Sequence, residues 1–395
     1  MSLRQSVLCD IAIRDLDNRV RRVDLGGLLR KLLLFEKVAI KSAALQEVAV
    51  LASAFKQDGL KQLIESGILR FSFQDSTLVT DIHQNGIRNL PPFQFGFGQA
   101  TLQYADEKLR KHLKSLESVP GLGLPDRRSL EEATWTRLIR TPPSFLPNII
   151  SQSEEDLRTN KPVLSLAVNE IIKKEIGSGA PTCSLKIEEV KPRVFYVVNN
   201  LEATLKISQE KAHGILNNGV LSIAKINQRL EDMSVHSAIT GFTEDEAPLL
   251  FKKLSGFLTS QNPEILEKQL GRVQTILGLP EISPQKPVNV ENLMKARDSS
   301  ELREFQAWLY KFEGKEDKEV EELVHAVGLR VGSLLSSAPG KAIRFAATTA
   351  LGLIPLAGLV LGPVSGAIDT FVVSEMLPSS GVFAFLTKTY PSLFK

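Results

Sequence analysis

The sequence feature that most constrains this chain is a run of 24 consecutive residues without a charge, 345–368, between Arg344 and Asp369. About 18 such residues already suffice for a candidate membrane-spanning helix. At ~1.5 Å per residue a helix of this length extends about 36 Å, more than the ~30 Å hydrocarbon core of a bilayer. The run must therefore enter a membrane or be buried in a protein core.

Small residues dominate the run and limit how well it would insert. Four glycines, two prolines and five alanines dilute its ten Leu, Ile, Val and Phe residues, so insertion into a bilayer would be marginal. Marginal hydrophobicity is what a conditionally inserting segment would show, because such a protein must stay soluble before it is triggered. The residues expected to carry membrane insertion or oligomerisation are Gly352, Pro355, Gly358, Gly362, Gly366, Lys341, Arg344 and Asp369.

The glycines, the proline and the flanking charged residues play different parts in the membrane interpretation. Gly358, Gly362 and Gly366 form two overlapping GxxxG motifs, a pattern that lets a second helix approach closely, so self-association is expected. Pro355 would kink the segment. Lys341 and Arg344 precede the run and Asp369 follows it, so the positive-inside bias would leave the large N-terminal part cytoplasmic.

A buried hairpin is the alternative fate of the same run. In this interpretation the chain breaks near Pro355, the glycines permit close packing, and the apolar continuation at 371–373 and 382–386 completes a soluble core. The protein would then be a soluble interaction scaffold, with a protein partner meeting the faces near 19–22 or 93–97.

Composition bounds the remaining function classes. A chain of 395 residues with 43% hydrophobic residues is long enough for about two to three domains with sizeable cores, which excludes disordered and collagen-like classes. A net charge of +3 does not indicate a nucleic-acid partner. Cys9 and Cys183 are far apart, and residues 1–10 lack the apolar run of a secretory signal, so we expect a cytoplasmic protein, associated with the inner face of a membrane if the segment inserts.

Hydrophobic periodicity predicts the secondary structure of the first half. The pattern indicates a strand at 7–13, a helix at 25–35 and a strand at 37–40. Ser42 is a plausible N-cap for a helix through Phe55. The runs 68–73 and 77–82 flank a short polar turn and predict a β-hairpin.

The second half is predicted to be mostly helical. A single helix is expected at 154–176 and a hairpin at 184–187 and 194–198, after which the pattern is helical from Ser208 almost to the end. One helical face carries Leu302, Phe305, Leu309 and Phe312, so this face is expected to pack against another part of the protein.

These patterns together define the expected fold class. The chain is predicted to be α+β and predominantly helical, with a mixed α/β N-terminal region containing short hairpins and an all-α C-terminal half that ends in the glycine-rich apolar segment. The expected regions are a mixed α/β N-terminal module at 1–120, a mixed α/β middle region at 121–207, a helical domain at 208–338 and the apolar C-terminal segment at 339–395.

Catalytic and metal-binding motifs are missing from the sequence. The five histidines form no HxxxH, HExxH or HxE pattern, so no metal site, cofactor or catalytic residue is predicted. Glu189 and Lys191 share one strand face and could in principle serve a nuclease metal ion, but a solvated strand edge is favoured. The protein is therefore expected not to be an enzyme, unless a site is assembled from distant loops.

Two further patterns are candidate interaction surfaces. Phe93, Phe95 and Phe97 alternate at period two and share one face of an extended segment, which favours core packing over base stacking. Arg19, Arg21 and Arg22 are followed by Asp24, and a solvated face is the simplest interpretation. The leading functional hypothesis is a membrane-acting effector or membrane-associated adaptor, toxin-like or defence-related, whose segment 345–368 inserts.

Overall fold

Short buried strands alternate with helices over the first part of the chain, and this order builds a parallel sheet. In the computed structural model, five strands lie in the order β11-β1-β4-β5-β8, and every neighbouring pair is parallel. Their bounds are β1 (Ser6–Cys9), β4 (Lys37–Ser42), β5 (Leu69–Phe73), β8 (Ile139–Arg140) and β11 (Ile239–Thr240). The first and last of these strands to be synthesised are neighbours, with Val7 opposite Ile239.

The structure describes residues 6–14, 20–42, 45–73, 77–82, 93–98, 111–159, 161–241, 246–254, 263–277, 279, 289–312, 315, 318–320, 324 and 380–394.

Alternation along the strands gives the parallel sheet two different faces. Val7, Val38, Ile40, Leu69 and Phe71 join one large core with the neighbouring helices. Leu8 and Ala39 point the other way and pack with Ala238 in a small separate cluster. One face of the sheet is therefore the main core, and the other meets the end of a single long helix.

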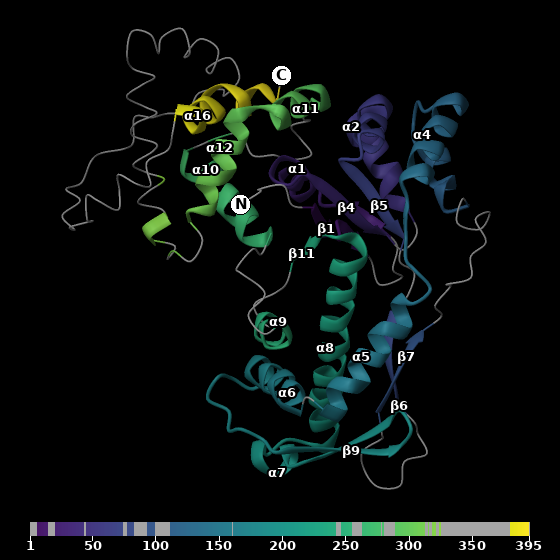
Figure 1. Cartoon of the computed structure of the whole chain (residues 1–395), viewed down its shortest axis with the longest axis vertical. Helices are drawn as coiled ribbons and strands as arrows, with labels where there is room; N and C mark the ends of the chain where they lie inside the picture. Colours follow the sequence, from purple (N-terminus) through teal and green to yellow (C-terminus); the bar gives the residue numbers. More distant parts are fainter. Residues whose placement is uncertain are drawn as a thin grey trace, which may run out of the picture.

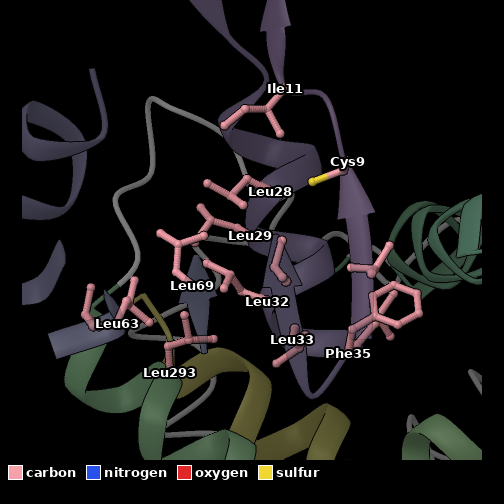
Figure 2. Packing of buried hydrophobic residues seen from close by; sticks show 14 of the residues in the cluster. Cys9, Ile11, Leu28, Leu29, Leu32, Leu33, Phe35, Leu63, Leu69 and Leu293 are labelled. Carbon is pink, nitrogen blue, oxygen red and sulfur yellow. The ribbon is translucent and has the colours of Figure 1, made fainter. Parts of the chain in front are cut away.

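Three helices, labelled in Figure 1, and a 3-10 helix lie between β1 and β8 in the order of the chain. They are α1 (Leu25–Leu34), α2 (Gln46–Glu65), η1 (Lys111–Ser118) and α4 (Leu124–Arg137), and a two-stranded ribbon of β2 (Ala12–Arg14) and β3 (Val20–Val23) precedes α1. Asp24 starts α1 by accepting the Gly27 N–H at 2.8 Å. Figure 2 shows Leu28, Leu29 and Leu32 of α1 beside Leu69 of β5.

A second lobe contains an antiparallel sheet in the order β6-β7-β10-β9. Phe93, Phe95, Phe195 and Val197 point from this sheet into a core shared with α5, α6 and α8. The bounds are β6 (Thr77–Ile82), β7 (Phe93–Gly98), β9 (Leu185–Lys191), β10 (Val194–Asn199), α5 (Phe145–Thr159), α6 (Lys161–Glu175), α7 (Leu201–Leu205), α8 (Gln209–His236) and α9 (Ala247–Leu254). Helix α8 runs from this lobe to the parallel sheet (Figure 1).

The last described helices pack beside α1 and close the main core. They are α10 (Pro263–Leu277), α11 (Val290–Asp298), α12 (Ser300–Tyr310), α16 (Ser380–Ala384), the π-helical turn η3 (Phe385–Thr389) and α17 (Tyr390–Ser392). We call residues 380–394 the C-terminal strap. Phe385 of the strap stacks on Phe305 of α12 with ring centroids 4.4 Å apart, and Asn289 donates its N–H to the Leu393 carbonyl at 2.9 Å.

The structure confirms the mixed α/β class and the helical majority. The helical stripe at Leu302, Phe305, Leu309 and Phe312 is buried as predicted, and β9 pairs antiparallel with β10 as the predicted hairpin. The described part of the C-terminal half is not all-α as expected, because it contains the strand β11, which the pattern did not indicate.

The predicted hairpin at 68–73 and 77–82 is wrong. β5 pairs with β4 and β8 in the parallel sheet, whereas β6 pairs with β7 in the antiparallel sheet. The cause is visible in β5, where both Phe71 and Ser72 are buried, because an internal strand of a parallel sheet is covered on both faces. β5 and β6, although neighbours in the sequence, therefore belong to different sheets.

Two helix boundaries also differ from expectation. Helix α2 begins at Gln46, and its N-cap is Leu45, whose backbone is left-handed with φ of 50°. Ser42 is therefore not the N-cap; its hydroxyl accepts the Leu45 N–H at 2.7 Å, just before the helix begins. The single helix expected at 154–176 is two helices, α5 and α6. Pro162, in the first turn of α6, has no N–H to continue a helical hydrogen-bond ladder.

Candidate functional site

The residues predicted to act at a membrane lie outside the described part of the chain. These are Lys341, Arg344, Gly352, Pro355, Gly358, Gly362, Gly366 and Asp369, together with the whole run 345–368. The structure does describe what flanks them. Val320 and Val324 precede the run, Val382 and Phe385 follow it, and all four side chains belong to the main core.

A different group of polar side chains gathers where the strands of the parallel sheet end. Lys41 and Ser72 are register partners near the carboxyl ends of β4 and β5. Asp232 and His236 lie one turn apart in the last turns of α8. We call these four residues the sheet-edge cluster. The carboxyl edge of a parallel sheet is where such folds usually bind ligands, so this cluster is the candidate site.

Two direct contacts link the strands of the cluster to α8. The Lys41 ammonium forms an ion pair with the Asp232 carboxylate, whose side chain is 1% exposed. Ser72 Oγ lies 3.1 Å from His236 Nε2, within hydrogen-bond distance. The Lys41 side chain is 25% exposed, so solvent reaches the ammonium of this ion pair more easily than the carboxylate.

The environment of His236 favours its neutral form. Burial lowers the pKa of His236; the neighbouring Asp232 carboxylate partly opposes this, and the Lys41 ammonium adds to it. His236 Nδ1 is buried and has no hydrogen-bond partner among the described residues. A neutral imidazole can either accept from Ser72 or donate to it, depending on which ring nitrogen carries the proton.

The cluster has part of the geometry of a nucleophile and a base. A serine hydroxyl within reach of a neutral imidazole is the pairing that nucleophilic catalysis uses, usually with a third group that orients the base. In the described structure Ser72 is fully buried, and no carboxylate bonds to Nδ1. The contacts therefore hold α8 against the sheet, and access to Ser72 would require movement of neighbouring groups.

Sequence reasoning missed the sheet-edge cluster. It set every histidine aside because no neighbouring residue in the sequence could orient one. Two signals were present: Asp232 and His236 are four residues apart in a helical pattern, and Lys41 and Ser72 end buried strand runs. Their juxtaposition depends on the strand order, which the sequence pattern did not reveal.

The carboxylate of the candidate nuclease pair, Glu189, is engaged by two arginines. Arg158 forms an ion pair with Glu189 at 2.8 Å, and the Arg193 N–H donates to the same carboxylate at 2.8 Å. These contacts lower the pKa of Glu189 to about 2. Glu189 therefore serves as an anchor between α5 and the β9–β10 hairpin. Within the described ranges, no three His, Cys, Asp or Glu side chains come together in a way that could hold a metal ion.

The remaining candidates from the sequence are the two cysteines, the phenylalanines of β7 and the arginine cluster at 19–22. Cys9 and Cys183 are both buried, and burial raises the pKa of the Cys9 thiol to about 12. Phe93 and Phe95 point into the core of the second lobe, so core packing is confirmed for both and they cannot offer a partner surface. Arg19, and the side chains of Arg21 and Arg22, lie outside the described residues.

Comparisons with known proteins gave no match to a family model, a curated protein or a solved structure. Of the helices that the structure describes, none combines the length and the apolar character needed to cross a bilayer.

Proposed function

We propose that this protein is a membrane-acting effector or membrane-associated adaptor whose apolar segment 345–368 enters a lipid bilayer. The observation that carries the proposal is the run of 24 residues without a charge, long enough to span a membrane. The α/β part would serve as the recognition or regulatory module, with the sheet-edge cluster as its candidate site. A toxin-like or defence-related role suits a segment that inserts only when triggered.

The anchoring of both flanks favours entry and exit on one side of the membrane. Val324 and the C-terminal strap belong to the same core, so a single crossing would require the strap to leave that core. With a turn near Pro355, limbs of about 10–13 residues would extend roughly 15–20 Å, about half of the hydrocarbon thickness. A re-entrant hairpin is therefore the form of insertion that we propose.

Flotation on anionic liposomes, with dye release in parallel, tests the proposed function. Leu359→Arg places a charge near the centre of the segment, where it costs about 2.5–3.5 kcal/mol in a bilayer. Leu124→Arg is the matched control, because Leu124 on α4 is already 55% exposed. The intact chain and Leu124→Arg should float and release dye, and Leu359→Arg should do neither. Equal flotation of all three proteins would contradict the assignment to this segment.

A labelling experiment separates the re-entrant form from a single crossing. Ser380→Cys lies in the exposed first residue of α16, and Lys295→Cys is an exposed reference on α11. The native cysteines are buried and react slowly. On protein added to sealed vesicles, a membrane-impermeant maleimide should label both introduced cysteines. Protection of Ser380→Cys alone would indicate that the strap has crossed the membrane.

The GxxxG motifs predict self-association through the same segment. Gly362→Leu should weaken oligomerisation in vesicles, measured by crosslinking, while leaving the folded core unchanged. Unchanged crosslinking would remove the glycine stripe from the proposal.

A soluble interaction scaffold is the second candidate function. It is supported by Val382, Phe385 and Leu386, the apolar continuation that this alternative predicted to complete a core, all of which are buried against α12 and its neighbours. An intact chain that stays at the bottom of the flotation gradient, combined with a lowered unfolding midpoint in Leu359→Arg, would favour this function over the first.

A further inference from the structure

A cavity of about 460 Å³ opens at the end of the parallel sheet opposite to the sheet-edge cluster. It lies between the end of α1, the turn that joins α2 to β5, and the junction of α11 and α12. Its lining combines charged side chains with apolar ones, of which Leu33, Phe35 and Leu302 are already buried and Ile68 is half-buried. A cavity of this size matches the range of small-molecule sites.

Arg297, from the last turn of α11, lines this cavity and already makes two bonds. Its Nη1 donates to the Phe35 carbonyl at 2.9 Å and its Nη2 to the Glu36 carbonyl at 2.6 Å. Gln306 of α12 donates to the Leu33 and Leu34 carbonyls, both at 3.0 Å. Together these side chains satisfy carbonyls that the end of α1 leaves without helical partners.

Both Nη atoms of Arg297 donate hydrogen bonds, but its positive charge is poorly compensated. No salt bridge joins Arg297 to a carboxylate in the described part of the chain, and its Nε is buried without a hydrogen-bond partner. Burial lowers the pKa of Arg297 to about 10, although Asp298 and Glu36 oppose this from a distance. A buried cation is normally paired, because burial without a partner is costly.

Charged side chains around the cavity leave a surplus of positive charge. Lys37 and Arg303 at the rim balance Glu36 and Asp298 in number. The carboxyl end of α1 supplies only about half a negative charge towards Arg297. The cavity therefore has room, a surplus of positive charge and a guanidinium whose buried Nε–H has no hydrogen-bond partner, and a guanidinium pairs best with a carboxylate or phosphate.

We propose that this cavity binds a small organic anion, with its carboxylate or phosphate group at the guanidinium of Arg297 and its apolar part against Ile68, the half-buried apolar side chain of the lining. Arg303 and Lys37 hold the same anionic group from the rim. This inference is independent of the membrane proposal, because all of its residues lie in the described part of the chain and none belongs to 345–368.

Calorimetric titration at fixed ionic strength tests the site. The probes are phenyl phosphate and benzoate, which carry the two anionic groups on one apolar ring, and benzyl alcohol, which has the ring without the charge. The wild-type chain should bind at least one of the two anions with a Kd near or below about 1 mM, and benzyl alcohol should bind at least about tenfold more weakly. The anion that binds more tightly identifies the group.

The test replaces a residue at the rim, because replacing Arg297 would also remove two hydrogen bonds to carbonyls at the end of α1. Arg303→Gln should weaken binding about tenfold, the effect of losing one charge-assisted contact. Arg128→Gln on α4 is the control, since it removes one exposed positive charge far from the cavity lining. No binding of either anion at about 10 mM, or equal weakening by the two variants, would overturn the proposal.

Discussion

At the scale of single residues, the structure relies on a few buried polar contacts that join distant parts of the chain. Gln274 on α10 donates to the Tyr390 hydroxyl of the C-terminal strap at 2.6 Å, with both side chains buried. In the second lobe, Asn227 donates to Ser153 and to Asp156, each at 2.9 Å. Contacts of this kind specify which surfaces meet, because a buried polar group without its partner is costly.

Removing the Tyr390 hydroxyl tests one such contact. Tyr390→Phe keeps the ring in place and leaves the buried Gln274 amide without its acceptor, so the free energy of unfolding should fall by about 1–3 kcal/mol. Urea denaturation measures the change. Tyr196→Phe, at a half-exposed position of β10, is the matched control and should alter stability by less than about 0.5 kcal/mol. A near-neutral Tyr390→Phe would show that the contact carries little stability.

His236 makes a specific contribution to pH dependence. Its pKa is lowered in the folded state, so the unfolded chain, with an ordinary pKa of about 6.5, binds more protons as the pH falls. Its contribution to stability is therefore present above about pH 6.5 and is lost as the pH falls towards the folded pKa. His236→Gln should lose less unfolding free energy between about pH 7.5 and 5.5 than the wild type does. Identical losses in the two proteins would exclude this role for His236.

At the scale of elements, close helix packing depends on where glycines stand. Gly219 of α8 faces α6, and a Cβ at this position would lie 2.6 Å from Val168 Cγ2 and 3.4 Å from the Val168 backbone. At Gly214, about one turn earlier in the same helix, an added Cβ would meet no neighbouring heavy atom within 4 Å. Position 219 therefore needs a glycine because Val168 leaves no room for a side chain, whereas Gly214 can be replaced.

Alanine at these two positions should change stability in opposite directions. Gly219→Ala forces α6 and α8 apart and should destabilise the protein by about 1–3 kcal/mol. Gly214→Ala meets no obstacle and should stabilise it by up to about 1 kcal/mol, because alanine favours a helix more than glycine does. Thermal unfolding of both variants beside the wild type measures the difference. Stabilisation by Gly219→Ala would mean that the two helices are not tightly packed there.

The elements also show how far sequence reasoning reaches. Strong periodicity sufficed for α1 and α12, because each displays an apolar face, and the β-branched and aromatic residues of β9 and β10 sufficed for their hairpin. It failed at β5, whose apolar run looks the same in a hairpin and in a parallel sheet. It also could not locate the sheet-edge cluster or the Arg297 cavity, because both depend on contacts such as Arg297 with Phe35, 262 residues apart.

At the scale of the whole molecule, the main core joins the first strand to the last residues. Val7 and Leu393 belong to the same hydrophobic cluster. The strap contributes Phe385, which is fully buried and stacks on Phe305. The parallel sheet and the C-terminal helices should therefore unfold as one cooperative unit, although the strap and the sheet are separated widely in sequence.

Phe385→Ala tests this cooperativity. Loss of the ring should lower the free energy of unfolding by about 3–5 kcal/mol. The fall in the urea midpoint should be equal when unfolding is followed by tryptophan fluorescence and by far-ultraviolet circular dichroism. Leu124→Ala, which truncates an exposed apolar side chain, is the control and should be close to neutral. Separate transitions for the two signals would show that the strap melts on its own.

The position of the strap in the core also has a consequence during translation. The leucines of α1 leave the ribosome long before Val382, Phe385 and Leu393, which complete their hydrophobic cluster. β1 likewise waits for β11, whose Ile239 pairs with Val7. Nascent chains therefore carry exposed apolar surface until the strap has been made, so ribosome-stalled chains that end before the strap should bind chaperones more strongly than chains that include it.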